Sequence, residues 1–476
     1  MSETMKKAIG GIRAVIGRVL FLGGSAQIVL GIFWLCRNFG TVPDFWESTL
    51  CREAGKTLIC DEYMGIAYPL LIRTAEGIAG IFPLPFFVYL YLIQILLAFG
   101  AARYFLKSFL PGAGRWFTVW GALVMLTVPF AMQCQLAVLP HSVTGSLFLM
   151  ELGCFRRARE EKNRPVLRIV KMGLLWLMQA LLMPEFLLFG GLPIVAFAVI
   201  CLLQKYGMQG AKNLLEDEKA SENGEQLRRM LGILLVTAVF LMIVPKIREM
   251  TIQRGAYGRM GNSPEASAMR RFAWDNFGEL YEFWPDELIQ ALPQSDITTC
   301  NRYPDRKIWI LGEKVDAAYG EAHAREIYGQ VAKAGMRERF SRNMKEILQD
   351  LAGYALPTAS QLWFLSGKSY DSFSGYNYDI MRSRAPYLTA VYLRYCALWM
   401  PAGILAAVFL KFAGRKRMIL LPVLSAGLMV LWYTFQGGGM LDPKNGMVIS
   451  MLWCAFICGR MLQGYSDDRE AENGQI

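Results

Sequence analysis

The chain has 476 residues, of which 54% are hydrophobic and 13% aromatic. Its formal net charge is +11, but the excess of Lys and Arg follows the predicted sides of a membrane and forms no patch suited to nucleic acid. Several apolar runs approach the length of about 20 residues that spans a bilayer. Composition therefore excludes a protein that is soluble throughout and a nucleic-acid partner, and predicts an all-α polytopic membrane protein.

The apolar runs predict about ten transmembrane helices. They lie near residues 17–36, 83–105, 116–138, 140–155, 170–184, 186–204, 230–246, 389–410, 417–435 and 446–463. Loops 156–171, 205–229 and 411–417 are basic, whereas turns 139–144 and 183–186 contain no Lys or Arg. Because positively charged loops stay in the cytoplasm, we expect a multi-pass protein of the cell membrane with both termini cytoplasmic.

This orientation divides the chain into four parts. Residues 1–246 form a seven-span transmembrane module, whose first outer loop is 37–62. Residues 247–388 form an extracytoplasmic domain, residues 389–463 form three further transmembrane helices, and residues 464–476 form a cytoplasmic tail.

Local helix signals recur in the extracytoplasmic segment. Residues 263–265 supply a hydroxyl cap, a proline in the first turn and an acid near the positive end of the helix dipole. Residues 284–287 begin a second helix, and segments 317–334 and 336–353 are helical and amphipathic. We expect a mainly helical domain packed on the outer ends of the spans.

Two adjacent carboxylates, Asp61 and Glu62, stand where the first outer loop turns back into apolar sequence. Apolar residues between 67 and 78 follow at spacings of three and four, which predicts a short helix lying in the membrane interface and kinked by Pro69. Carboxylates at a bilayer edge are suited to act on a lipid-linked substrate. A simpler interpretation is that Asp61 caps this helix, with Glu62 in its first turn.

This arrangement resembles the GT-C glycosyltransferases, which include the protein O-mannosyltransferases and the aminoarabinose transferases. In that family a short first span precedes an outer loop that ends in an acidic pair, here Asp61-Glu62, and an interfacial helix follows. The resemblance covers roughly residues 1–245 as a pattern. It implies a GT-C-like fold and an inverting transfer of a sugar from a polyprenyl-phosphate donor to a glycan, lipid or protein acceptor. It also implies Asp61 as the catalytic carboxylate.

The leaving polyprenyl phosphate needs cationic partners or a metal. Either Lys246 or Arg248, after the seventh span, is the preferred phosphate ligand, because residues two apart on a helix point to nearly opposite faces. Arg73 on the predicted interfacial helix is a further candidate. Each cation has the alternative role of snorkelling at the interface or neutralising a nearby acid. The ten cysteines show no metal-site spacing. No metal ligand is predicted, and the need for a divalent cofactor stays open.

The sequence departs from the family pattern at two outer turns. Turn 139–144 lacks the acid that many members carry, and its His141 is a candidate for binding phosphate or acceptor, or a hydrogen-bonded helix end. Turn 183–186 carries Glu185 where relatives often have a basic residue. An acid at the membrane edge is a candidate substrate-binding group, with a solvated carboxylate as the alternative.

Two other classes of function fit the same composition. A transporter or lipid flippase would need ionisable residues within paired spans. Glu151 and Glu185 are the main acids of that kind, and both lie near span ends. A non-catalytic envelope scaffold would instead make its contacts through the extracytoplasmic domain.

Cys51 and Cys60 both fall in the first outer loop. Disulfides form outside the cytoplasm, so the two residues predict a bridge that restrains Asp61. The alternative is two free thiols.

Overall fold

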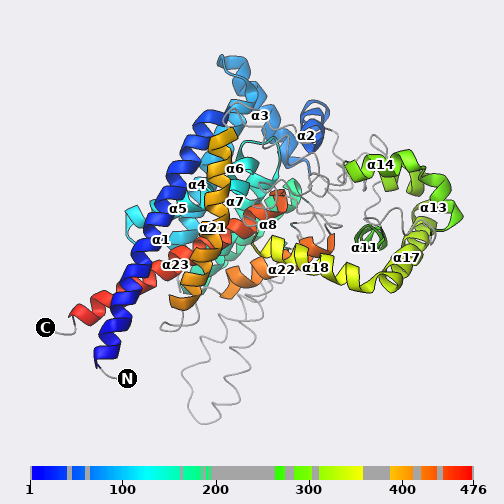
Figure 1. The fold of residues 1–476 in the computed structure, drawn as a ribbon. Helices are drawn as coiled ribbons and strands as arrows, with labels where there is room; N and C mark the ends of the chain where they lie inside the picture. The colour runs from blue at the N-terminus through cyan, green and yellow to red at the C-terminus, as the bar shows by residue number, and fades with distance from the viewer. Residues whose placement is uncertain are drawn as a thin grey trace, which may run out of the picture.

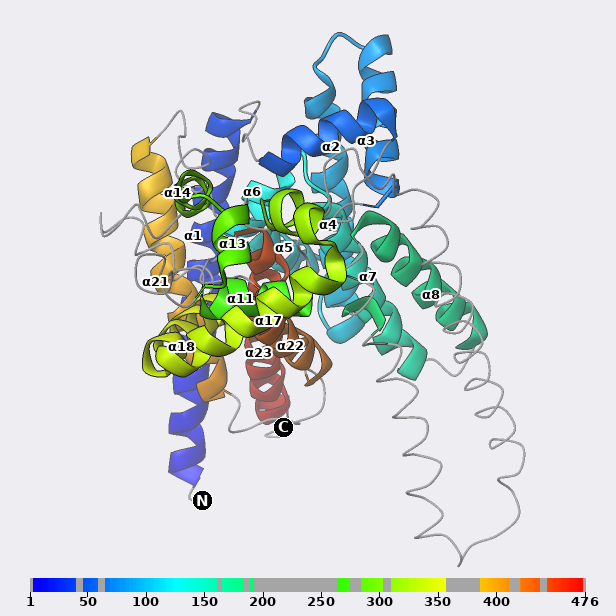
Figure 2. The same ribbon diagram turned by 90° about the vertical axis from the view of Figure 1, so that its right-hand side faces the viewer.

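The computed structural model describes residues 3–39, 46–58, 65–160, 165–183, 186, 189–191, 193, 263–273, 284–302, 310–356, 386–410, 420–436 and 443–473. Within these ranges every regular element is a helix and no strand occurs, which confirms the all-helical class. Figure 1 shows a bundle of long helices with both ends of the chain at one end of the bundle. A group of shorter helices lies to one side, and Figure 2 shows this group from the front.

The helices fall into three groups. The bundle contains α1 (Glu3–Asn38), α4 (Phe86–Phe109), α5 (Arg115–Leu126), α6 (Pro129–Gln135), α7 (His141–Glu160), α8 (Pro165–Leu182), α21 (Pro386–Leu410), α22 (Leu420–Gln436) and α23 (Pro443–Asn473). The end of the bundle away from the termini carries α2 (Trp46–Thr57) and α3 (Ala67–Ile81). The side group, here called the helical domain, contains α11 (Pro264–Phe272), α13 (Asp286–Ala291), α14 (Gln294–Arg302), η2 (Leu311–Asp316), α16 (Ala317–Tyr319), α17 (Glu321–Glu338) and α18 (Phe340–Ala355).

Helices long and apolar enough to cross a membrane are fewer than the sequence predicts. Three occur in the part of the chain that the structure describes, and they are Ala14–Asn38, Phe86–Phe109 and Tyr387–Val408. Shorter apolar helices, Val170–Leu182, Pro422–Phe435 and Gly446–Met461, occupy three other predicted spans. The predicted spans 186–204 and 230–246 lie largely or wholly outside the described residues. The protein is therefore a helical membrane protein, while the number of ten spans stays a prediction.

The third predicted span, 116–138, is wrong as a single helix. It consists of α5 and α6, which meet at a bend of 80°. Pro129 is the first residue of α6, and a proline there cannot continue α5 because it has no N–H and its ring clashes with the preceding turn. The Thr127 hydroxyl donates to the Leu123 carbonyl at 2.8 Å, and this bond supplies a donor to one of the backbone carbonyls at the end of α5.

The bundle core is apolar and closely packed. α4 packs on α5 and α7, α7 packs on α8, and α1 packs on α21 and α23. Leu22, Leu96 and Leu405 are instead more than half exposed, one each on α1, α4 and α21. Apolar side chains on the outside of a bundle suit a lipid environment, because lipid tails are as apolar as leucine and cover these side chains without any polar group being buried.

The helical domain has a core of its own, which includes Met269, Leu288 and Tyr328. The predicted cap is confirmed, since the Ser263 hydroxyl accepts a hydrogen bond from the Ala266 N–H at 3.1 Å. The predicted helix 317–334 is instead interrupted at Gly320, whose φ of +77° favours glycine, and α17 begins after it.

Buried charges hold α11 against α18, the helix of this domain that reaches the bundle. The Arg271 guanidinium on α11 donates to the Asp350 carboxylate on α18. Next to it, burial lowers the pKa of Arg270 to about 10, against the opposing influence of Tyr328 and Asp316. α18 then packs on α22 of the bundle. The domain is therefore fastened to the bundle chiefly through α18. Its predicted place at the outer ends of the spans stays a prediction.

Candidate site at the end of the bundle

The acidic pair Asp61 and Glu62 lies outside the described residues, but the helices on both sides of it are described. α2 ends before the pair and α3 begins after it, and the two helices pack on each other. The chain leaves α2 through Leu58, which has a φ of +59°. A leucine in the left-handed region costs roughly 1–2 kcal/mol. The exit from α2 toward the acidic pair is therefore strained.

Gly65 anchors the other side of the acidic segment to the end of α8. Its N–H donates to the Leu182 carbonyl at 3.1 Å. A Cβ atom on residue 65 would lie 1.9 Å from the Leu181 carbonyl oxygen, a backbone atom that cannot move aside. Only glycine fits this approach, so the start of α3 is held against α8 by a contact that a larger residue would break.

Arg73 on α3 binds the last turn of α2. Its Nε donates to the Gly55 carbonyl at 2.9 Å, and its Nη2 donates to the Lys56 carbonyl at 2.7 Å. These carbonyls have no partner within α2, so Arg73 caps the helix from outside. Arg73 thus fixes the geometry of the acidic segment's two flanking helices. Its predicted contact with phosphate stays a prediction.

A buried polar chain joins α3 to the bundle below it. The Tyr68 hydroxyl donates to Gln94 Oε1 on α4 at 2.9 Å. Gln94 Nε2 donates in turn to the carbonyls of Gln135 and Ala137, between α6 and α7, at 2.9 and 3.1 Å. Tyr68 and Gln94 are both fully buried. Buried hydrogen bonds of this kind hold α3 in one orientation, because a break would leave polar groups without water.

The structure revises the prediction for α3. Pro69 lies in the first turn, where a missing N–H has no helical partner to lose, so it starts the helix and does not interrupt it. The buried residues of α3 are Tyr68, Pro69, Ile72 and Ala75. Leu70, one of the apolar residues from which the buried face was predicted, is half exposed. The position of α3 in a membrane interface stays a prediction.

The remaining predicted site residues divide into two groups. His141 is described, and it is buried as the first residue of α7, close in sequence to the Ala137 carbonyl that Gln94 binds. Glu185, Lys246 and Arg248 lie outside the described residues, as does Cys60 of the predicted disulfide. The described residues therefore do not show whether all of the predicted site residues lie together.

The sequence reading missed Gly65, Tyr68 and Gln94. The sequence did contain a signal for Gln94, since a polar amide within an apolar span commonly forms a hydrogen bond to a neighbouring helix. No such signal marked Gly65, because the requirement for glycine at this position comes from the backbone of Leu181, more than a hundred residues later in the chain.

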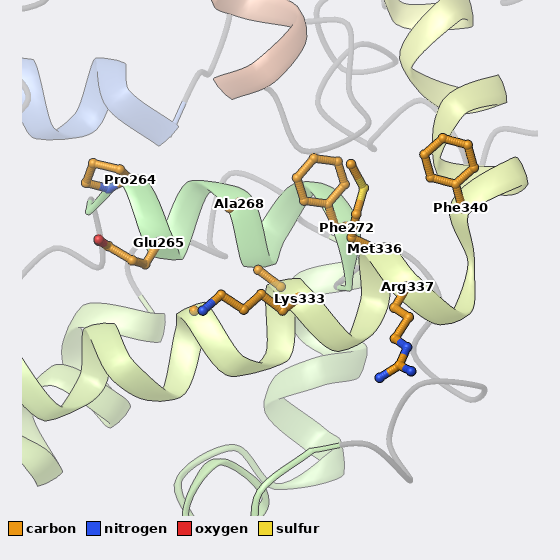
Figure 3. Close-up of a pocket in the computed structure, with 10 residues that line it drawn as sticks. Pro264, Glu265, Ala268, Phe272, Lys333, Met336, Arg337 and Phe340 are labelled. Atoms are coloured by element: carbon orange, nitrogen blue, oxygen red, sulfur yellow. The ribbon is translucent and has the colours of Figure 1, made fainter.

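A groove of about 710 Å³ lies in the helical domain between α11 and α17. Figure 3 shows Phe272, Met336 and Phe340 extending to one side, with Arg337 pointing the opposite way. Its lining comes from α11, α17 and the start of α18, and no predicted site residue lies there. In the described ranges no three His, Cys, Asp or Glu side chains gather as metal ligands.

The chain matches no family model, no curated protein and no solved structure.

Proposed function

We propose that the protein is an integral membrane glycosyltransferase of the GT-C type. It moves a sugar from a polyprenyl-phosphate donor to an envelope acceptor at the outer face of the cell membrane, with inversion. The supporting observation is the frame around the acidic pair. Gly65 and Arg73 fasten the helices that flank Asp61 and Glu62 to each other and to α8, at the end of the bundle away from the termini.

A rigid frame suits this chemistry because the reaction depends on position. The acceptor hydroxyl needs a base as it attacks the anomeric carbon, and an ionised Asp61 is that base. Polyprenyl phosphate is already a good leaving group, so no strong acid is required. A carboxylate held within a fraction of an ångström of its productive position contributes more than a mobile one.

In this proposal, cations on the outer side of the membrane bind the leaving phosphate. Lys246 and Arg248 are the first candidates, and Arg73 is the described one. A guanidinium has five N–H donors, and the bonds from Arg73 to Gly55 and Lys56 engage two of its nitrogens. The remaining donors are suited to a phosphate oxygen. Arg73 would then couple phosphate binding to the end of α2.

The proposal requires a particular orientation in the membrane. Both termini and loop 205–229 are cytoplasmic, while loop 37–62 and residues 247–388 lie outside, because the basic loops hold the cytoplasmic side. We expect a cysteine introduced beside Ser263 to react with a membrane-impermeant thiol reagent on intact cells, and one beside Ser221 to react only after permeabilisation. The native chain measures the background from its own cysteines. The opposite labelling pattern would reject both the orientation and the site.

Deletion of the gene is expected to remove one sugar from an envelope glycan, lipid or protein, as measured by mass spectrometry of envelope fractions. The wild-type gene should restore that sugar, because the enzyme alone supplies the transfer. Purified protein should also release polyprenyl phosphate from a polyprenyl-phosphate sugar when acceptor is added. An unchanged set of envelope sugars, together with no turnover of the donor lipid, would contradict the proposal.

The transporter or flippase alternative has one specific observation in its favour. Glu151 lies within α7 and is fully buried, and buried acids within a membrane often mark ion or proton pathways. Movement of a labelled lipid or solute without any change in its covalent structure would support this alternative. A scaffold would show neither movement nor transfer.

A further inference from the structure

The centre of the α7–α8 pair contains a carboxyl group and an amide that touch. Gln179 Nε2 on α8 donates to Glu151 Oε2 on α7 at 2.7 Å. Both residues have no exposed surface. α7 and α8 pack on each other, and because neither side chain has exposed surface, the two polar groups are shielded from lipid.

The other oxygen of each group has no hydrogen-bond donor in the described part of the chain. These atoms are Glu151 Oε1 and Gln179 Oε1, and both are fully buried. Glu151 also forms no ion pair with any described cation. An ionised carboxylate in this position would keep one oxygen without a donor, with no positive charge to offset its desolvation.

A third segment closes the pair off from solvent. A Cβ atom placed on Gly190 would lie 3.0 Å from Gln179 Oε1 and 3.3 Å from Glu151 Oε2. The backbone of residue 190 therefore lies directly over the two polar groups. A larger side chain there would press on both of them, so the third segment leaves little room beside the pair.

A single proton bound to Glu151 would give both unpaired oxygens, Glu151 Oε1 and Gln179 Oε1, a hydrogen bond. A protonated Glu151 carries an O–H on Oε1, and that O–H needs an acceptor, which Gln179 Oε1 offers. A planar carboxyl group and a planar amide can pair edge to edge through two hydrogen bonds, one in each direction. We infer that Glu151 is a proton-binding site, in which a neutral carboxyl group and the Gln179 amide form a doubly hydrogen-bonded pair between α7 and α8.

This pair stands directly beneath the frame of the acidic segment. Gln179 lies one helical turn before Leu182, and its own carbonyl accepts from the Met183 N–H at 2.8 Å. Leu182 is the residue to which Gly65 is anchored. The bound proton therefore fixes the end of α8 that holds Gly65. The inference concerns the bundle itself and holds for a transferase or a transporter alike.

Infrared spectroscopy of the purified full-length protein at neutral pH tests the protonation. We expect the wild-type spectrum to contain a carbonyl band of a protonated carboxyl group that is absent from Glu151→Gln. The matched control is Glu53→Gln, at an exposed glutamate of α2, which should keep the protonated carboxyl band of the wild type. Loss of an ionised carboxylate band in Glu151→Gln would overturn the inference.

Thermal unfolding tests the pairing. Glu151→Gln should unfold near the wild-type temperature, because two amides form the same pair of hydrogen bonds. Gln179→Leu should unfold at a lower temperature, since it leaves a buried carboxyl group without its partner. A Gln179→Leu protein as stable as wild type would overturn the pairing.

A second variant keeps the test decisive if Glu151→Gln does not fold. Gln179→Glu replaces the amide by a second carboxyl group, and two neutral carboxyl groups pair through the same two hydrogen bonds. We therefore expect an additional protonated carboxyl band. A Gln179→Glu spectrum that gains ionised carboxylate absorption and has no protonated carboxyl band would contradict a site that binds protons.

Discussion

Gly65→Ala is expected to reduce sugar transfer by about 10²-fold while the protein still inserts and remains helical. The added methyl group would meet the Leu181 carbonyl oxygen at 1.9 Å, so either α3 or the end of α8 must move. The hydrogen bond from the Gly65 N–H to Leu182 would lengthen or break with that movement. Asp61 is four residues from Gly65 along the chain, and a displacement of about 1 Å there is enough to misplace a catalytic base.

Gly80→Ala is the matched control for this substitution. Gly80 lies on α3, the helix that follows Gly65, and a Cβ atom there meets nothing within 4 Å. It should therefore keep the wild-type rate, and alanine's higher helix propensity should, if anything, stabilise α3 slightly. Transfer rates measured with purified proteins decide the matter. A normal rate in Gly65→Ala would mean that the position of α3 against α8 has no part in catalysis.

Helix starts with a local cause could be predicted from the sequence. The Ser263 cap needs only its own hydroxyl and an N–H three residues later, so the residues from 263 to 265 specify it without help from the rest of the fold. The same holds for α13, which begins after Pro285 with two acids in its first turn. These signals are short-range, and tertiary packing did not override them.

The break between α5 and α6 could have been predicted but was not. Pro129 is a strong local signal against a continuous helix. The apolar run around it was given more weight, because length and hydrophobicity are what define a span. In the structure the proline prevails and the chain bends by 80°. Hydropathy alone does not distinguish a straight span from a broken one.

The frame of the candidate site could not have been predicted, because its contacts join distant parts of the chain. Tyr68 and Gln94 are 26 residues apart, and Gln94 reaches Ala137 a further 43 residues on. Arg73 shows a second reason why the frame could not have been predicted. Its charge suggested a phosphate ligand, yet its bonds to Gly55 and Lys56 depend on where α2 ends. A sequence pattern indicates which residue types are present, whereas the fold decides what each one contacts.

Asp61→Asn is expected to reduce sugar transfer by about 10²-fold or more, because the amide cannot accept a proton from the acceptor hydroxyl. Asn keeps nearly the size of Asp and caps a helix about as well. The described frame is held by contacts that Gly65, Arg73 and Tyr68 make with Leu182, with the last turn of α2 and with Gln94. Insertion, helix content and donor-lipid binding should therefore remain normal.

Glu62→Gln is the informative companion to this variant. On a helix adjacent residues point about 100° apart, so Glu62 should support the base and not duplicate it, and its loss should cost much less. The measurement is release of polyprenyl phosphate from a polyprenyl-phosphate sugar by each purified variant, with donor binding measured separately. If Asp61 is only a helix cap, Asp61→Asn will transfer sugar at the wild-type rate, because Asn satisfies the same backbone N–H. That result would reject Asp61 as the base even if the protein proves to be a glycosyltransferase.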